Sequence, residues 1–388
     1  MYAIDATLVL DLGNSETRGK VLYRVGSDVI AEKFTLSNRF SKITTAGYEI
    51  PEDYTEAKST IFALEAEVDG DKISGEYVNG ILCDKEFSNT VFRPSSLDKK
   101  HKSLTTALSF AEGILIATKI IGKRLGIVTL SEIDINWNVV SLLPPAEMNE
   151  GASKLEDIFR SIKLIDCVMP VEKLNVKVNK VKIYPEGFCA FIGTIFNRGY
   201  KIRQEMKKWL GVSVLVLDIG AGTTDIMVID KTTVIDNSKD SLSLGGNQVT
   251  QKIKAELRRK RDLALPDGDI LEGVISGKVM DGFTTVDITD IVQSKKSEVA
   301  EEEVQKLREY FETTGILPRT IAGVLTCGGG SLGGKTPALE PLSKILIKFI
   351  KNLAPNSELL PLPKDTEGNE ISARDLNLEG ASILAELM

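Results

Sequence analysis

Histidine and cysteine are scarce in this sequence, and their scarcity excludes several catalytic chemistries. The 388 residues include one histidine and four cysteines. The cysteines are Cys83, Cys167, Cys189 and Cys327. They are widely separated and form no Cys-x-x-Cys pair, so neither a zinc site nor a disulfide framework is predicted. His101 lies in the polar run 98–102, which is typical of a solvated turn, so a Ser-His-Asp or Cys-His mechanism is not expected.

The sequence also lacks long apolar runs and an excess of basic residues. No stretch approaches eighteen consecutive apolar residues, so no membrane-spanning segment is expected. The first residues form neither a basic nor a long apolar leader, so we expect a cytoplasmic protein. The 48 basic and 55 acidic residues give a net charge of -7, which argues against direct binding of nucleic acid.

What is present is the composition of an ordinary globular protein. Hydrophobic residues make up 42% of the chain and charged residues 27%. A chain of 388 residues is too long for one small core, so two or three structural units are expected.

One segment occurs twice in the chain. Residues 7–22 read TLVLDLGNSETRGKVL and residues 214–229 read VLVLDIGAGTTDIMVI, with seven of sixteen positions identical at a constant offset of 207. In each copy an apolar run ends in aspartate, a turn of small residues follows, and a second run begins. This pattern predicts two β-hairpins with polar tips, and hence two similar α/β halves.

The small residues at both tips suit close contact with phosphate. Without bulky side chains the backbone can approach a ligand, and successive amides and hydroxyls can surround its oxygens. Asp11 and Asp218 each end an apolar strand, and two carboxylates facing a polyphosphate require a cation such as Mg²⁺. The alternative is a pair of structural Asp-x-Gly turns, but two copies of such similar sequence favour the ligand site.

The two segments resemble the phosphate-binding loops of the superfamily that contains actin, sugar kinases and heat-shock chaperone ATPases. A third segment, 325–334, follows an apolar strand and is similar to the adenosine loop of that superfamily. The resemblance implies a two-domain α/β fold, the actin-like or ribonuclease H-like ATPase fold, with a central nucleotide cleft. Order and spacing agree along essentially the whole chain.

The third segment also matches the P-loop pattern through 329–336, which ends in Gly-Lys-Thr. A P-loop domain needs a later strand with a second acidic residue, and too little chain follows residue 336 to supply it. The P-loop interpretation is therefore not favoured.

The resemblance implies a role for each motif. Asp11 and Asp218 would hold hydrated Mg²⁺, and Glu186, in a Pro-Glu-x-x-x-Ala stretch, would orient the attacking water. Arg18 stands where actins carry a phosphate-contacting lysine, and Lys20, two residues further on, is the alternative. The nucleotide, ATP or alternatively GTP, would contact Gly13, Asn14, Ser15, Arg18, Gly220, Ala221, Gly222, Thr223, Thr224, Gly328, Gly329, Gly330 and Ser331.

Several elements are predicted around these motifs. Helical periodicity indicates a helix over 104–125, and apolar runs indicate strands over 29–36, 59–68 and 133–143. Alternation over 171–184 indicates a hairpin, and a further helix is expected from 184 to 210. A helix capped near 245–247 carries a basic cluster at 258–261, which is typical of a solvated face.

The predicted division of the chain follows from these elements. Domain I is expected over 1–190, with an inserted small subdomain at 38–94, and is completed by a C-terminal helix at 374–388. Domain II is expected over 191–373. Gly380 and Ala381 in the last helix would let two helices cross closely.

The resemblance is greatest to the ParM-type bacterial actins that segregate plasmids. It implies an ATPase that assembles head-to-tail into a filament with ATP and Mg²⁺, and that reaches its cargo through an adaptor protein bound to centromere-like plasmid DNA. No membrane element is seen at either end of the sequence. The alternative is an actin-fold ATPase that does not assemble, such as a small-molecule kinase or a chaperone-like ATPase.

Overall fold

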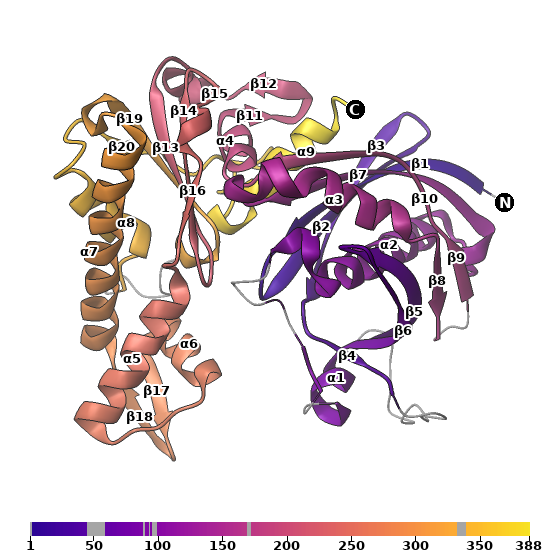
Figure 1. The fold of residues 1–388 in the computed structure, drawn as a ribbon, viewed down its shortest axis with the longest axis horizontal. Helices are drawn as coiled ribbons and strands as arrows, with labels where there is room; N and C mark the ends of the chain where they lie inside the picture. Colours follow the sequence, from indigo (N-terminus) through magenta and orange to yellow (C-terminus); the bar gives the residue numbers. More distant parts are fainter. Residues whose placement is uncertain are drawn as a thin grey trace. The chain divides into compact units, whose positions relative to one another are not determined.

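A computed structural model describes most of the chain and divides it into two compact units (Figure 1). The described residues are 2–44, 59–87, 90–92, 94, 99–168, 172–331 and 339–388. Unit 1 comprises Met1–Leu143, Glu147–Pro185 and Leu384–Met388, and unit 2 comprises Pro144–Ala146 and Glu186–Ile383. The sequence-based domain boundaries, with the inserted subdomain, stay a prediction.

The main sheet of unit 1 is mixed, with the strand order β10-β7-β1-β2-β3. The strands are β1 (Tyr2–Leu12), β2 (Glu16–Val25), β3 (Asp28–Ser37), β7 (Ile133–Leu143) and β10 (Lys177–Pro185). β1 pairs antiparallel with β2 and parallel with β7. Leu8, Val9 and Leu10 of β1 are fully buried. Because successive residues point to opposite faces, both faces of β1 are covered.

A second sheet in unit 1 has the order β4-β6-β5-β8-β9. Its strands are β4 (Phe40–Lys42), β5 (Ser59–Val68), β6 (Asp71–Gly80), β8 (Leu164–Cys167) and β9 (Glu172–Asn175). The helices of unit 1 are α1 (Ile81–Glu86), α2 (Leu104–Leu125) and α3 (Met148–Ser161). α2 contacts β1 and β2 of the first sheet and β5 of the second, so it lies between them (Figure 1).

The length and composition of α2 would allow it to cross a membrane. However, 78% of its most apolar window is buried inside the protein. Its side chains, including Leu108, Phe110 and Ile114, belong to the core of unit 1. α2 is therefore packed as a core helix, as the two sheets on either side of it require.

The sheet of unit 2 has the order β15-β14-β13-β19-β20, with β16 also pairing with β14. Its strands are β13 (Ser213–Ile219), β14 (Thr224–Asp230), β15 (Thr233–Val234), β16 (Asp240–Leu242), β19 (Ile321–Cys327) and β20 (Glu358–Leu359). Two small ribbons are formed by β11 (Phe196–Asn197) with β12 (Lys201–Ile202) and by β17 (Lys278–Asp281) with β18 (Thr284–Asp287). β13 and β19 are parallel, so their carboxyl ends lie at the same edge.

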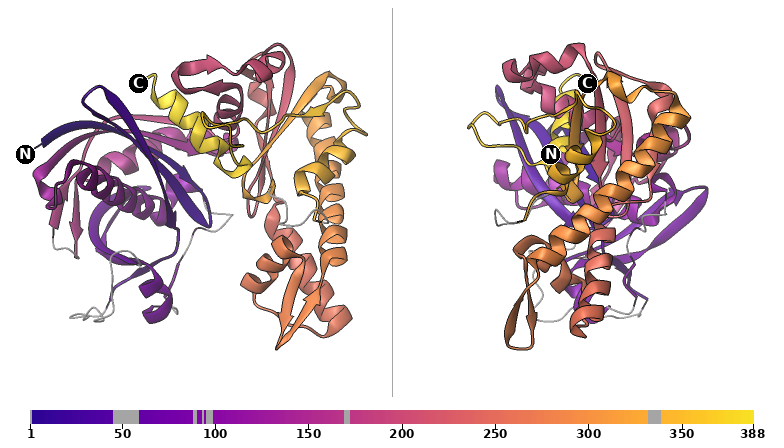
Figure 2. Two further views of the ribbon diagram at one scale, coloured as in Figure 1. Left: turned by 180° about the vertical axis from the view of Figure 1, so that it is seen from behind. Right: turned by 90° about the vertical axis from the view of Figure 1, so that its left-hand side faces the viewer.

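The helices of unit 2 surround this sheet. They are α4 (Phe188–Ile195), α5 (Gly246–Arg261), α6 (Asp267–Ser276), α7 (Thr289–Thr314), α8 (Leu342–Ile350) and α9 (Leu376–Ala385). α7, the long orange helix of Figure 2, packs against α5 and α8. Apolar side chains of these helices and of β13 form a core that is separate from the core of unit 1.

The repeated sequence forms two hairpins, as predicted. β1 and β2 pair antiparallel, and so do β13 and β14. Asp11 lies opposite Arg18, and Asp218 lies opposite Asp225, which is the same cross-strand pair at the offset of 207. The predicted helix over 104–125 and strand over 133–143 are also confirmed.

Two predicted elements are wrong. The alternating stretch 171–184 does not form a hairpin, because β9 pairs with β8 and β10 pairs with β7 in a different sheet. The helix expected from 184 to 210 is α4 alone and ends at Ile195. The chain then turns back through β11 and β12, where Gly199 and Tyr200 have positive φ values of 73° and 56°. Such a turn cannot be part of an α-helix.

α4 and α9 cross with their backbones in contact. A Cβ atom on Gly193 would lie 2.6 Å from the Leu376 carbonyl oxygen and 2.8 Å from the Gly380 nitrogen. A Cβ atom on Gly380 would overlap the Cys189 carbonyl oxygen. The close crossing expected at Gly380 is therefore confirmed, and it requires glycine on both helices.

Glu112 in unit 1 and Glu303 in unit 2 are carboxyl groups buried on core helices. Glu112 of α2 accepts a hydrogen bond from Asn79 Nδ2 at 2.7 Å, and burial raises its pKa to about 7. Glu303 of α7 is fully buried, and neither of its oxygens has a hydrogen-bond partner among the described residues. Burial raises the pKa of Glu303 to about 7, although the nearby Thr224 hydroxyl opposes part of the shift. Both groups favour the protonated form in the folded protein.

We expect Gly380→Ala to destabilise unit 2 strongly. The added methyl group would overlap the backbone of α4, so the helices would have to separate, at a cost of about 3 kcal/mol or more. Gly268→Ala is the matched control, because a Cβ atom on Gly268 meets nothing within 4 Å. Urea unfolding followed by circular dichroism should show a large loss of stability for the first variant only. Equal midpoints for the two variants would contradict the close crossing.

Glu303→Gln should reduce the dependence of stability on pH. Because the pKa of Glu303 is about 7 in the folded protein and 4.5 in the reference state, its stabilising contribution is lost as pH rises from about 4.5 through 7. The loss is on the order of 3 kcal/mol, since each pKa unit corresponds to about 1.4 kcal/mol. The variant should unfold at a higher temperature than the wild type at pH 8, with a smaller difference at pH 5.

The control for this measurement is Glu302→Gln, which alters an exposed neighbour that pairs with Lys252 at 2.8 Å. Its curve of melting temperature against pH should stay close to that of the wild type, because exposed ion pairs contribute little. If the Glu303→Gln curve also ran parallel to the wild-type curve, the proposed titration of Glu303 would be wrong.

Candidate functional site

The hairpin of unit 1 brings an acidic and a basic side chain together beside its turn. Asp11 ends β1, and Arg18 Nη2 lies 3.8 Å from Asp11 Oδ2. Arg18 Nε lies 3.3 Å from Glu16 Oε1. Lys20, the alternative phosphate contact, is 7% exposed and lies opposite Val9 in the register. Arg18 therefore lies within ion-pair distance of the aspartate.

Asn38 holds the turn of this hairpin in place. The Gly13 nitrogen donates to the Glu16 carbonyl oxygen at 3.1 Å, which closes the turn. Asn38 Nδ2 donates to the Gly13 carbonyl oxygen, and Asn38 Oδ1 accepts from Thr17 Oγ1 at 2.8 Å and from Ser109 Oγ at 3.0 Å. Asn38 is 2% exposed, so these bonds are made away from water. The turn that carries Asn14 and Ser15 is thus fixed to α2.

A small polar pocket adjoins the same turn. Leu12, Asn14 and Asn38 line one part of it, and Lys100 lies on another part. The remaining lining residues of α2 and its start are Ser103, Thr105, Thr106 and Ser109, and Pro94 completes it. The hydroxyl groups of this lining already have partners, since Ser109 Oγ donates to Asn38 Oδ1 and Thr106 Oγ1 donates to the Lys100 carbonyl oxygen.

The hairpin of unit 2 has the same turn with different side chains. The Gly220 nitrogen donates to the Thr223 carbonyl oxygen at 2.8 Å, at the offset of 207 from the Gly13 bond. Thr224 Oγ1 donates to the Leu244 carbonyl oxygen at 2.9 Å. Asp218 is 6% exposed and is the next-to-last residue of β13. The two turns are therefore built alike, and each follows an aspartate.

Three loops of unit 2 meet with their backbones in contact. A Cβ atom on Gly245 would lie 2.8 Å from the carbonyl oxygens of Gly220 and Ala221. A Cβ atom on Gly330 would lie 2.6 Å from Ile219 Cγ2. The Gly246 nitrogen also donates to the Gly220 carbonyl oxygen at 3.0 Å. At these positions a side chain would collide with neighbouring atoms of the chain, so the surface at this edge of the sheet is closely packed and requires glycine.

The segment after β19 completes this surface. Gly328 has a φ of 81°, and its nitrogen donates to the Ala373 carbonyl oxygen at 3.2 Å. A Cβ atom on Gly328 would collide with Asp218 Oδ1. Gly329, Gly330 and Ser331 follow in a short 3₁₀ helix. Residues 332–338, which include the Gly-Lys-Thr end of the P-loop match, lie outside the described residues.

The turn that follows Glu186 is joined to Asp218 by a bridging residue that the sequence analysis did not identify. Asn377 Nδ2 donates to Asp218 Oδ2 at 2.5 Å. Asn377 Oδ1 accepts from the Gly187 nitrogen at 2.9 Å and from the Ala190 nitrogen at 3.1 Å. Glu186 is 7% exposed and directly precedes this turn. A polar residue within the apolar run 376–378 is the sequence signal that could have identified Asn377.

Among the described residues, no group of three or more histidine, cysteine or acidic side chains could hold a metal by itself. Asp11 and Asp218 are each a single, nearly buried carboxylate at the end of a strand. Either carboxylate by itself suits Mg²⁺, which keeps several waters and can bind through one carboxylate together with substrate phosphates.

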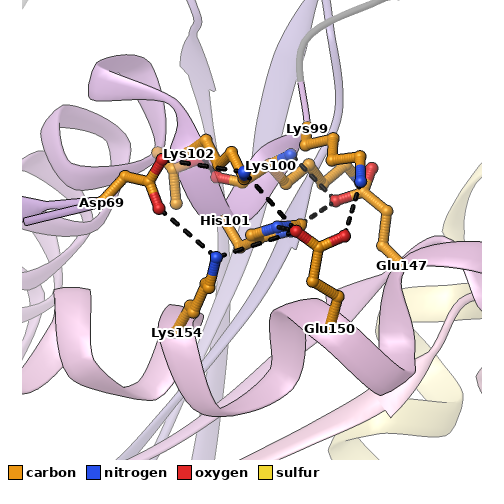
Figure 3. Close-up of polar contacts among 9 residues, drawn as sticks. Asp69, Lys99, Lys100, His101, Lys102, Glu147, Glu150 and Lys154 are labelled. Atoms are coloured by element: carbon orange, nitrogen blue, oxygen red, sulfur yellow. Dashed lines mark hydrogen bonds and ion pairs between the residues drawn. The ribbon is translucent and has the colours of Figure 1, made fainter.

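The structure corrects the expectation for His101. Its side chain is fully buried rather than solvated. His101 Nδ1 lies 3.0 Å from Glu147 Oε2, and His101 Nε2 lies 3.6 Å from Glu150 Oε1 (Figure 3). A Cβ atom on Gly151 would lie 2.5 Å from His101 Nδ1, so the ring fills the space beside α3. The polar run therefore covers a buried histidine that attaches the start of α2 to α3.

The predicted site residues thus form two groups. In unit 1 the hairpin brings together Asp11, Gly13, Asn14, Ser15 and Arg18. In unit 2 one edge of the sheet brings together Glu186, Asp218, Gly220, Ala221, Gly222, Thr223, Thr224, Gly328, Gly329, Gly330 and Ser331. Sequence reasoning missed Asn38 and Asn377, the buried amides that hold these turns.

Comparison with known proteins identifies the fold. Residues 216–334 match the family model described as archaeal actin homologue MreB-like, C-terminal. The archaeal actin homologue Ta0583 has a TM-score of 0.65 at 15% identity, covering 99% of this chain and 100% of that chain. No curated protein sequence is significantly similar.

Two further solved structures have the same fold. Bacillus thuringiensis ParM, solved with ATP, has a TM-score of 0.61 at 14% identity, covering 98% of both chains. The actin-like protein Alp7A has a TM-score of 0.64 at 16% identity, covering 99% of this chain and 96% of that chain. The chain, with its two repeated hairpins and the glycine-lined edge of unit 2, thus has the fold of the actin-like superfamily. The superfamily members to which it is similar include archaeal actin homologues and ParM proteins.

Proposed function

We propose that the protein binds and hydrolyses ATP with Mg²⁺, with GTP as the alternative nucleotide. The observation that carries this proposal is the pair of hairpins in which an aspartate ends a buried strand and a hydrogen-bonded turn of small residues follows. Solved structures of the same fold support it, since a ParM is described with ATP and Ta0583 with ADP.

Each group of residues would have a separate task. Asp11 and Asp218 would hold hydrated Mg²⁺, which would neutralise charge on the phosphates. The turns at 13–15 and 220–224 would surround the β- and γ-phosphates with backbone amides and hydroxyls. The glycine backbone at 328–331 would take the adenosine. Such an arrangement accelerates phosphoryl transfer through positioning and electrostatic stabilisation.

Glu186 would orient the attacking water. Its carboxylate would accept a hydrogen bond from that water as the oxygen bonds to the γ-phosphorus and the bond to the β-phosphate oxygen breaks, giving ADP and inorganic phosphate. Arg18 would contact phosphate, because it lies within ion-pair distance of Asp11. Lys20 remains the alternative for that contact.

Glu186→Gln tests this assignment. The amide has the same shape but is a poor acceptor for the proton of the water, so ATP turnover should fall about 100-fold while nucleotide binding stays within about threefold. Phosphate release and the binding of a fluorescent ATP analogue measure the two effects. Glu367→Gln, an exposed change in the same unit, is the control and should turn over like the wild type. Unchanged turnover in Glu186→Gln would exclude Glu186 from the reaction.

We further propose that the protein assembles head-to-tail into cytoplasmic filaments that segregate plasmid DNA through an adaptor protein. The fold is shared with ParM proteins, one of which is described as a non-polymerisable mutant. Head-to-tail contacts do not close on themselves, so they propagate. The net charge of -7 agrees with attachment to DNA through an adaptor.

Light scattering should rise when ATP and Mg²⁺ are added above a critical protein concentration, and electron microscopy should show filaments in the same sample. The rise should not occur without nucleotide, because nucleotide binding favours the assembling state. Hydrolysis without any concentration-dependent rise would favour the second candidate, an actin-fold ATPase that does not assemble.

A further inference from the structure

Asn377 joins two parts of unit 2, the end of β13 with Asp218 and the turn that follows Glu186. The proposed reaction requires these two parts to keep a fixed position relative to each other. We propose that Asn377 is a positioning residue for ATP hydrolysis, which holds the Asp218 carboxylate and the turn that carries Glu186 in a fixed relation. This inference rests on the proposed function. Asn377 itself is assigned no contact with the nucleotide.

Both polar atoms of the Asn377 side-chain amide make hydrogen bonds. Nδ2 donates to Asp218 Oδ2 at 2.5 Å, and Oδ1 accepts from the nitrogens of Gly187 and Ala190 at 2.9 and 3.1 Å. A carboxylate accepts only and backbone N–H groups donate only, so the orientation of the amide follows from its partners. Asn377 is 5% exposed, and water therefore offers little competition for these bonds.

Through its Oδ1 atom Asn377 caps the N-terminus of α4, although it lies far from α4 in the sequence. The first amides of a helix have no partner within the helix, and α4 has no side-chain cap of its own. Asn377 Oδ1 supplies the acceptor that a local capping residue would supply elsewhere. The amide of Gly187, which has a φ of 71°, is thereby fixed directly after Glu186.

Through its Nδ2 atom Asn377 fixes Asp218. One carboxylate oxygen accepts from Asn377 Nδ2, and the other lies against the backbone of Gly328, where no side chain could be accommodated. The carboxylate is therefore confined from two directions. A group confined in this way need not reorganise when charge develops in the transition state.

The turn at Gly187 also packs against β13, the strand that ends in Asp218. A Cβ atom on Gly187 would lie 3.2 Å from Val216 Cγ1 and 3.3 Å from Met227 Cε. Packing alone sets the approximate place of the turn. The hydrogen bonds of Asn377 set its register against Asp218, and misplacement by about 1 Å can lower a rate about 100-fold.

Three variants test the proposal. Asn377→Ala should lower kcat for ATP about 10-fold or more, with KM changed less than about threefold, because the reacting groups remain but lose their register. Asn377→Asp keeps the shape, but its ionised carboxylate cannot donate to Asp218 and repels it. Its kcat should therefore fall at least as far as that of Asn377→Ala. Ser382→Ala, which removes a buried hydroxyl bond to Leu378 on the same helix, is the control and should match the wild type.

A second measurement does not depend on activity. In the nucleotide-free protein, Asn377→Ala should accelerate amide hydrogen exchange at Gly187 and Ala190 about 10-fold or more, and Ser382→Ala should leave it unchanged. If Asn377→Ala does not fold, kcat of Asn377→Asp decides the matter.

The outcomes separate this inference from the proposed function. A wild type that hydrolyses ATP, with kcat within twofold in Asn377→Ala, or in Asn377→Asp where Asn377→Ala does not fold, would overturn the positioning role and leave the proposed function intact. A rise in KM alone would also overturn it. A wild type without turnover would overturn the proposed function and, with it, the role of Asn377, whose capping bonds would still be visible in the exchange rates.

Discussion

The contact of α4 with α9 is the constraint on which the arrangement of unit 2 depends. Gly193 and Gly380 bring the two helix backbones into contact, closer than any residue with a Cβ atom would permit. This distance places Asn377 within hydrogen-bond reach of both Asp218 and the start of α4. A wider crossing would leave the amides of α4 without acceptors and Asp218 without its donor. The packing of two helices thus determines the geometry of the candidate site.

The two hairpins have the same backbone turn and differ in charge. The turn bonds of Gly13 and Gly220 are equivalent, and a buried asparagine bonds the turn in unit 1 and the aspartate before the turn in unit 2. In unit 1 the residue opposite the aspartate is Arg18, whereas in unit 2 the equivalent residue is Asp225. One hairpin is therefore suited to contact anionic oxygens through a side chain, and the other has to use backbone amides and a cation.

The elements that sequence predicted well are those whose signal is local. An apolar strand followed by an aspartate and small residues describes each hairpin completely, because its two strands are adjacent in the chain. The stretch 171–184 has the same alternation, yet β9 and β10 pair with strands of different sheets. Alternation of polar and apolar residues indicates that one face of a strand is exposed. It does not indicate which other strand pairs with it. The prediction of a helix through residue 210 was wrong because Gly199 permits a turn, which the apolar residues on either side of it did not indicate.

Residues that act through distant partners cannot be recognised in the same way. Asn377 is separated by 159 residues from Asp218 and by 190 from Gly187. Within its own helix it is only an unexplained polar residue between two leucines. His101 is a similar case. The charged residues next to it in the sequence surround its side chain, and its buried ring contacts α3. In both cases the neighbours in space, not those in the chain, decide whether a polar side chain is solvated or bonded. A polar residue in an apolar helix should therefore be treated as an indication of a buried partner, because burying it without one would cost about 1–3 kcal/mol.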